Sequence, residues 1–177
     1  MKQHYPKTPH RKRNRLPEYD YSQTGYYFVT ICTKDKRKIF GKIINGEMTL
    51  NKPGKIVDKY WKEIPKHFSF AEIDEYIIMP NHIHGIIIID NENNVGDNHG
   101  CSLQTSRNME LLPRIISQYK SSRQIRKQFA NYKFVWQKSY YDRIIRNEKE
   151  LYNIRKYIQQ NPLKWDLVKN NIENLYM

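Results

Sequence analysis

DEYIIMPNHIHGIIIID, residues 74–90, has the sequence pattern from which the fold of this chain can be predicted. Two β-branched runs flank the turn signal Pro80-Asn81, a pattern typical of two buried strands joined by a tight turn. Side chains alternate between the two faces of a strand, so we expect His82 and His84 on one face. Two imidazoles held side by side in this way can bind one metal ion.

A structural interpretation of the same pair stays open, in which each histidine is a hydrogen-bonded residue of the core or of a sheet edge. A single histidine would favour that interpretation. Two histidines at i and i+2 in an apolar strand favour a metal site, because a buried polar group without a partner costs about 1 to 3 kcal/mol.

Length and charge limit the class of protein. A chain of 177 residues suffices for one well-filled core. We therefore expect a single domain over residues 19–177, preceded by a flexible basic arm at 1–18. The chain has 31 Lys and Arg against 18 Asp and Glu, which gives a formal net charge of +13 and favours a polyanion as partner. The arm carries Arg11, Lys12 and Arg13, which either contact phosphates or keep a disordered tail in solution.

The cysteines and the hydropathy indicate the cellular compartment in which the protein is expected. Cys32 and Cys101 lie far apart, in a strand-like run and in a polar loop, so no disulfide framework is expected. No apolar run reaches the length of a membrane span, and the basic N-terminus lacks the hydrophobic segment of a secretory signal. We expect a cytoplasmic protein that does not bind a membrane.

The pattern around the histidines predicts the remaining elements. YYFVTICT, residues 26–33, is expected to be a central strand, and Asn45-Gly46 is a strong hairpin signal. Helical spacing predicts one helix between Pro53 and Pro65 and a second over about 110–130. The polar stretch 91–108 is expected to be a mobile loop. A further strand lies within 134–145, and a last helix begins at Asn147 and is closed by Pro162.

This order predicts an α+β fold. Its core is β-α-β-β-α-β, the ferredoxin-like split arrangement, with an antiparallel sheet, helices on one face and an added C-terminal catalytic helix. The histidine strand is expected in the middle of the sheet.

The expected helix over 110–130 has a strongly basic face. A solvated charged surface is the ordinary explanation for such a face. No Asp or Glu lies between residues 114 and 138 to pair with its cations, so a phosphate-binding surface is favoured. The cations are Arg114, Lys120, Arg123, Arg126 and Lys127.

The last helix offers a nucleophile and a third ligand. Tyr157 and Asn161 are four residues apart and therefore share a face, at the border of the apolar stripe formed by Leu151, Ile154 and Ile158. Tyr157 could equally be a tyrosine that packs at the edge of the core. A divalent ion on His82, His84 and the Asn161 carbonyl, Mg²⁺ or Mn²⁺, would polarise a phosphodiester for attack by the phenol.

Four blocks of sequence carry a resemblance to a known family. PNHIHG at 80–85 resembles the motif of HUH endonucleases, specifically the single-tyrosine transposases. The four blocks, of which the second contains this motif, resemble their REP-associated tyrosine transposase branch: YDYSQTGYYFVTICT at 19–33, YIIMPNHIHGIII at 76–88, WQKSYYDRIIRNEKEL at 136–151 and YIQQNPLKW at 157–165.

The resemblance implies metal-dependent cleavage and rejoining of single-stranded DNA, next to an imperfect hairpin, through a 5′-phosphotyrosine intermediate. By it, His82, His84 and Tyr157 are functional, and Asn161 occupies a ligand position at which many relatives have Gln. Monomer and homodimer both remain open. Two other hypotheses are a non-catalytic nucleic-acid-binding module on a ferredoxin-like sheet and a hydrolase that uses metal-activated water.

Overall fold

The computed structural model describes residues 19–90, 110–122, 125, 127, 129 and 135–170. The expected basic arm at 1–18 with Arg11, Lys12 and Arg13, the expected loop at 91–108, and the cations Arg123 and Arg126 lie outside the described residues. Within the described part of the chain, no helix is both long and apolar enough to cross a membrane.

Four antiparallel strands form the central sheet. They are β1 (Gly25–Cys32), β4 (Ala71–Ile78), β5 (His82–Ile89) and β6 (Tyr141–Ile145). Their order is β4-β5-β1-β6, so β5 and β1 occupy the middle of the sheet. With α1 (Lys52–Lys62) and α3 (Leu111–Ser121) as connections, the order along the chain is β-α-β-β-α-β. The expected ferredoxin-like α+β fold, with the histidine strand inside the sheet, is confirmed.

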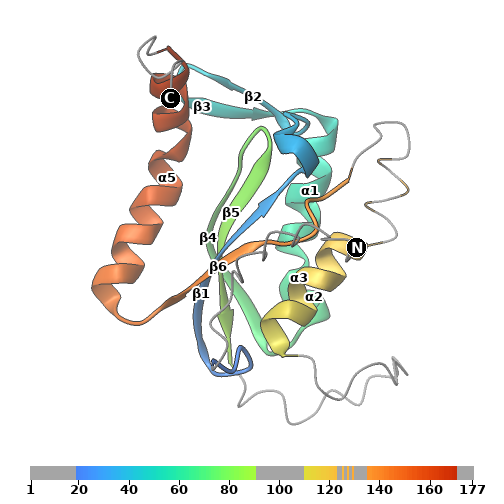
Figure 1. Cartoon of the computed structure of the whole chain (residues 1–177), viewed down its shortest axis with the longest axis vertical. Helices are drawn as coiled ribbons and strands as arrows, with labels where there is room; N and C mark the ends of the chain where they lie inside the picture. The colour runs from blue at the N-terminus through green and yellow to red at the C-terminus, as the bar shows by residue number, and fades with distance from the viewer. Residues whose placement is uncertain are drawn as a thin grey trace, which may run out of the picture.

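Helices cover the two faces of this sheet. Figure 1 shows α1, α2 (Ile64–His67) and α3 on one side and α5 (Glu148–Asn170) on the other. The larger core lies under α1 and α3, and the indole of Trp61 packs closely there against β5 at Gly85. A Cβ added at Gly85 would lie 2.4 Å from Cζ2 of Trp61, so glycine is required at this position. Under α5 lies a smaller core built from Ile86, Ile145, Leu151 and Ile158.

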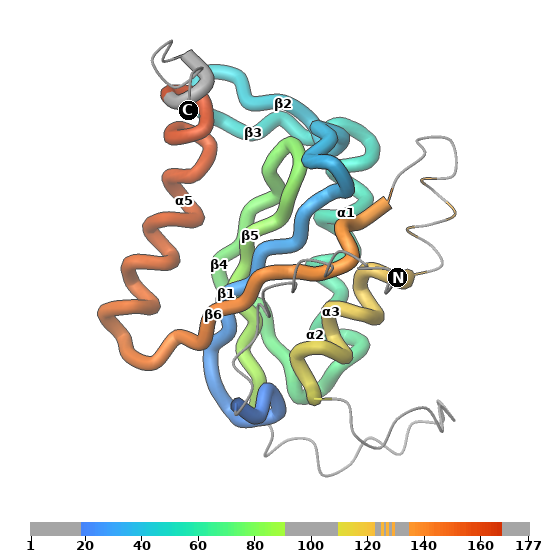
Figure 2. The backbone as a smooth tube through the Cα atoms, viewed as in Figure 1, coloured from blue at the N-terminus to red at the C-terminus, as the bar shows by residue number. Residues whose placement is uncertain are grey.

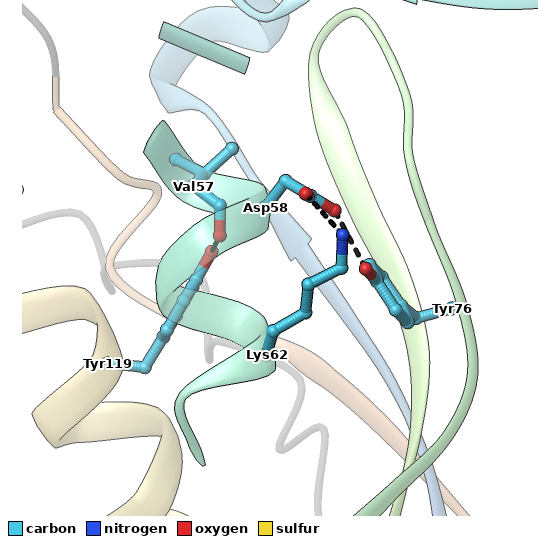
Figure 3. A network of polar contacts seen from close by, with 5 residues as sticks. All are labelled: Val57, Asp58, Lys62, Tyr76 and Tyr119. Carbon is cyan, nitrogen blue, oxygen red and sulfur yellow. Dashed lines mark hydrogen bonds and ion pairs between the residues drawn. The ribbon is translucent and has the colours of Figure 1, made fainter. Parts of the chain in front are cut away.

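Polar contacts fix α1 against its neighbours (Figure 3). Asp58 accepts a hydrogen bond of 2.7 Å from the Tyr76 hydroxyl on β4 and one of 2.8 Å from Nζ of Lys62. The hydroxyl of Tyr119, on α3, donates to the Val57 carbonyl over 3.0 Å. These bonds satisfy phenols that packing places inside the core.

The predicted hairpin at Asn45-Gly46 is confirmed. It joins β2 (Gly41–Ile44) to β3 (Glu47–Leu50), and its turn residues have φ values of 53° and 75°. Positive φ at both central residues is the backbone of the tight hairpin turn that the Asn-Gly pair favours. The turn reaches α5, because a Cβ at Gly46 would lie 3.0 Å from Cδ1 of Leu163.

Three predicted helix boundaries were wrong. The last helix does not stop at Pro162 but continues to Asn170, with the proline inside it. The helix expected over 110–130 breaks after Ser121; Ser122 has ψ of 117°, and its Oγ accepts a hydrogen bond of 3.4 Å from the Ile125 amide. A serine competes well for exposed backbone amides and so ends helices. The first helix ends at Lys62, and Pro65 lies in the first turn of α2.

Candidate active site

The strand β5 brings His82 and His84 to the face of the sheet that α5 covers. Their ring centroids are 4.4 Å apart, with the planes at 73°. The intervening Ile83 points into the opposite core. Only 7% of His84 is exposed. The expectation that alternation places both imidazoles on one face is confirmed.

Each imidazole is oriented through its Nδ1 atom. Nδ1 of His82 lies 2.6 Å from Oδ1 of Asn81, and Nδ1 of His84 lies 2.8 Å from Oγ1 of Thr30 on the neighbouring strand. An amide oxygen can only accept, so His82 carries its proton on Nδ1, and its Nε2 keeps a lone pair. The Thr30 hydroxyl can donate or accept, so its contact orients the His84 ring without fixing the tautomer. A contact at the second nitrogen is the arrangement that metal-binding histidines require.

Burial keeps both rings neutral at physiological pH. It lowers the pKa of His82 to about 4. Burial, and then the neighbouring His82, lower the pKa of His84 to about 3. Because a protonated imidazole cannot bind a metal ion, these shifts maintain the ligand form of the pair over the whole physiological range.

Tyr157 on α5 lies directly over the pair. Its hydroxyl is 3.3 Å from Nε2 of His84, and its ring meets Phe28 edge to face, with the centroids 6.1 Å apart. The side chain is 39% exposed, at the border of the apolar stripe where helical spacing predicts it. Tyr152 points away and is 64% exposed. The phenol is therefore accessible from solvent while it touches the histidine site.

Asn161 and Trp165 continue the same stripe of α5 towards His82. Successive residues four apart turn about 40° around a helix, so Asn161 lies between Tyr157 and Trp165 on the side facing the sheet. The Trp165 ring is 5.7 Å from that of His82, and only 7% of Asn161 is exposed. The amide of Asn161 is thus buried between the two contacts that α5 makes with the histidines.

An irregularity in β4 ties α5 to the sheet. The pairing of β4 with β5 runs from Ile73–Ile87 to Tyr76–Gly85, so β4 contains one extra residue there. The two residues of this bulge reach α5. Asp74 accepts hydrogen bonds of 2.9 Å and 2.7 Å from Nε and Nη2 of Arg155, and Glu75 accepts one of 3.1 Å from Gln159.

Of the basic residues proposed on the helix over 110–130, Arg114 and Lys120 lie on α3, across the sheet from this site. Arg114 is exposed, with its guanidinium 5.9 Å from the Phe68 ring centre, and Lys127 is exposed as well. Lys120 instead donates to the carbonyls of Gln137 and Lys138 over 2.6 Å and 2.9 Å. Its ammonium group therefore anchors a backbone segment.

Other cations lie beside the site, and the sequence analysis did not single them out. Nζ of Lys164 is 5.7 Å from the centre of the Tyr157 ring, and Nζ of Lys38 is 5.9 Å from the centre of the Trp165 ring. Lys164 follows Tyr157 by seven residues, a helical repeat that would have revealed it if α5 had been expected to pass Pro162.

The donor atoms fit a divalent ion. Among the described residues no three His, Cys, Asp or Glu side chains gather, so a metal ion on the histidine pair would need a further donor of another kind. Two neutral imidazoles with oriented rings and a hard amide oxygen form such a set, and the exposed border of α5 gives a phosphate access to it.

Comparison with known proteins agrees with this geometry. The model of the family described as Transposase IS200 like matches residues 21–161. An uncharacterised protein of Haemophilus influenzae is 39% identical, over 89% of this chain and 91% of that protein. Another protein of the same organism, provisionally named a REP-associated tyrosine transposase, is 26% identical over 85% of this chain and 77% of that protein. The solved REP-associated tyrosine transposase bound to a REP hairpin has the same fold, with a TM-score of 0.59 and 19% identity over 88% of this chain and 76% of that one.

The fold and the family match define a transposase. This chain belongs to the IS200-like transposase family, and its resemblance to the REP-associated tyrosine branch is confirmed.

Proposed function

We propose that this transposase cuts and rejoins single-stranded DNA through a covalent bond between Tyr157 and a 5′ phosphate. The contact between the Tyr157 hydroxyl and Nε2 of His84, at 3.3 Å, carries the proposal. It brings an accessible nucleophile to a pair of neutral imidazoles that are oriented as ligands. A tyrosine that merely closed the core edge would not need to meet a metal-binding nitrogen.

In the cleavage step, the Tyr157 oxygen forms a bond to phosphorus and the phenol proton leaves to solvent. The bond from phosphorus to the 3′ oxygen of the adjoining nucleotide breaks, and that oxygen takes up a proton to become a free 3′ hydroxyl. The phosphotyrosine retains the energy of the phosphodiester, so a 3′ hydroxyl can displace Tyr157 and rejoin the strand. No external energy source is needed.

Transposases of this type generally depend on a metal ion, and we assign the ligands as His82, His84 and Asn161. A bound Mg²⁺ or Mn²⁺ withdraws charge from the scissile phosphate and orients it. The chain itself contributes three things: Asn81 and Thr30 orient the imidazole rings, burial keeps the rings unprotonated, and α5 holds the phenol against His84.

The substrate we propose is a single strand with an imperfect hairpin near the cut. Support comes from the related solved transposase, which is bound to a REP hairpin. The assembly we propose can act as a single copy, because one chain supplies the histidines of β5 and the tyrosine of α5 in contact. A homodimer would then serve DNA pairing, without completing either site.

A direct test is to incubate the protein with end-labelled, hairpin-bearing single strands and Mn²⁺, and to denature the mixture. A labelled band that stays with the protein supports the covalent mechanism. Cut DNA without such a band would indicate hydrolysis by activated water. Neither product across a panel of hairpins, with binding intact, would indicate a module that binds nucleic acid without cutting it.

A further inference from the structure

Next to the histidine site lies a short basic loop, residues 34–38, with the sequence KDKRK. Its five side chains are all exposed, and four of them are cationic, against the single carboxylate of Asp35. The ion pairs of the described residues involve none of its lysines. A cluster of exposed lysines outside the ion pairs is the usual feature of a phosphate-binding surface.

Hydrogen bonds hold this loop in a fixed place relative to His82. Asn81 uses both ends of its amide: Oδ1 meets Nδ1 of His82 at 2.6 Å, and Nδ2 donates to the Lys36 carbonyl over 3.1 Å. The Thr33 hydroxyl donates to the Arg37 carbonyl over 2.8 Å. The same buried amide therefore orients a proposed metal ligand and positions the basic loop.

The backbone of the loop is bent sharply. Asp35 and Lys36 have φ values of 57° and 51°, in the left-handed region that costs non-glycine residues on the order of 1 kcal/mol or more. Such strain persists where surrounding contacts fix it, and the Asn81 and Thr33 bonds are those contacts. The lysines on both sides of Asp35 are exposed.

The C-terminal half of α5 faces this loop. Nζ of Lys38 lies 5.9 Å from the centre of the Trp165 ring, which is itself 5.7 Å from the His82 ring. Nζ of Lys164 lies over the Tyr157 ring at 5.7 Å. The loop follows β1 at the same end of the molecule as the C-terminal half of α5 (Figure 2). A row of cations thus leads from the nucleophile past His82.

We propose that Lys36 and Lys38 of the basic loop, together with Lys164 of α5, bind the phosphates of the single strand that adjoin the scissile phosphate. This inference rests on the proposed function for the position of the cut. Residues 157 to 165 of a helix span about 12 Å at 1.5 Å per residue. That length matches about three to four nucleotides of a stacked strand at 3.4 Å each. The strand follows α5 from Tyr157 towards Trp165 and leaves across the loop.

The assignment also explains the position of Lys38. A cation over an indole ring is held by the ring electrons, which restricts a long side chain that would otherwise move freely. Trp165 in this way keeps the Lys38 ammonium close to His82 before DNA arrives. Trp165 is a positioning residue, and the lysines are the binding residues.

Binding of the oligonucleotide (dT)20, measured by fluorescence anisotropy over a range of salt concentrations, tests the proposal. All proteins carry Tyr157→Phe, so no covalent chemistry contributes to the signal. The test variant is Lys36→Ala with Lys38→Ala. Its matched control is Lys55→Ala with Lys66→Ala, which removes the same charge from exposed positions on α1 and α2, across the sheet.

We expect the test variant to bind about 10-fold more weakly, and its log–log salt slope to be shallower by about 1.4, since each phosphate contact of a single strand contributes about 0.7. Lys164→Ala removes one contact and should make the log–log salt slope shallower by about 0.7. Trp165→Phe should preserve most of the affinity, and Trp165→Ala should lower it. The control should stay within about twofold of the parent.

Equal affinities and slopes in the test and control variants would overturn the proposal. That outcome differs from failure of the proposed function, which is the absence of a covalent adduct in the protein with Tyr157 intact. An adduct with no effect of the loop lysines would refute only the phosphate surface. A large effect of the lysines with no adduct would refute only the nucleophile.

Discussion

The hydroxyl of Tyr157 lies 3.3 Å from Nε2 of His84, although 73 positions separate the two residues in the chain. The contact exists because β5 aims His84 at the face that α5 covers, and because Arg155 and Gln159 hold α5 to the bulge of β4. The site therefore depends on tertiary packing as much as on the two residues.

Removing the nucleophile should separate binding from chemistry. Tyr157→Phe deletes one oxygen and keeps the ring contact with Phe28, so DNA binding and the fold should persist while the covalent adduct disappears. Gel analysis after denaturation measures the adduct. Tyr152→Phe is the control, because Tyr152 is exposed on another side of α5. An adduct retained by the Tyr157 variant would refute this nucleophile.

Removing a ligand should abolish metal binding. His84→Ala is expected to lower the affinity for Mn²⁺ at least 10-fold and to stop metal-dependent cleavage, since only one oriented imidazole remains. Titration calorimetry measures the affinity. His67→Ala, an exposed histidine of α2, is the matched control. Unchanged Mn²⁺ affinity in the His84 variant would exclude the ligand role.

The amide at position 161 should be replaceable only by another amide. Asn161→Gln preserves a carbonyl donor and should retain part of the Mn²⁺ affinity, whereas Asn161→Leu, of similar volume, should lose it. Thermal unfolding of the metal-free proteins shows whether each variant folds. Equal Mn²⁺ affinity in the Leu variant and the parent would mean that another group completes the site.

The link between Arg155 and Asp74 should affect rate more than stability. Arg155→Ala removes two hydrogen bonds at a partly exposed ion pair and should cost no more than about 1 kcal/mol of unfolding free energy. It should still slow adduct formation several-fold, because α5 loses a contact that positions Tyr157. Lys62→Ala breaks a similar pair on α1 and should leave that rate unchanged. Equal rates in the two variants would contradict a positioning role.

Stability without metal should fall as the solution is acidified. A histidine in the unfolded chain has a pKa near 6.5, whereas burial lowers the pKa values of His82 and His84 to about 4 and 3. Above pH 6.5 the two imidazoles are neutral in both the folded and the unfolded protein, so the unfolding free energy has its full value. Below it the unfolded state takes up protons first, so the unfolding free energy drops by about 1 kcal/mol per pH unit and histidine.

Urea unfolding in EDTA between pH 7 and pH 4.5 measures this effect. The double variant His82→Gln with His84→Gln should show a shallower dependence, because the remaining titrating groups are shared with the parent. Identical pH dependence in the two proteins would show that burial does not lower the pKa values of the two imidazoles.

The sequence predicted the strands and the histidine pair because local patterns determine them. Alternation alone puts His82 and His84 on one face, and the Asn45-Gly46 turn and the helical stripe that borders Tyr157 are equally local. The length of α5 is different. Pro162 removes one backbone donor, yet the helix continues, since Leu163 packs on the hairpin turn and Trp165 on the His82 ring. Contacts between distant segments overrode the local signal.

Dependence on contacts between distant segments also explains why several partners of the site were not predicted. Thr30 and Asn81 orient the imidazoles, but only the pairing register of β1 with β5 brings Thr30 opposite His84. The distance between Asp74 and Arg155 depends on a bulge that no periodicity reveals. Lys164 of α5 lies over the phenol ring and Lys38 of the loop after β1 lies over Trp165, whereas the sequence pattern pointed to the cations of the helix over 110–130.

The extra residue in β4 makes the position of α5 sensitive to the deletion of a single residue. Deleting Glu75 would restore an unbroken ladder with β5, which favours the sheet, while it would remove the partner of Gln159 and shift Asp74 relative to Arg155. Such a protein would fold with a more regular strand and carry its tyrosine on a loosened helix. A deletion of one amino acid far from the phenol in sequence could thus produce a well-behaved DNA-binding protein that has lost its ability to cut.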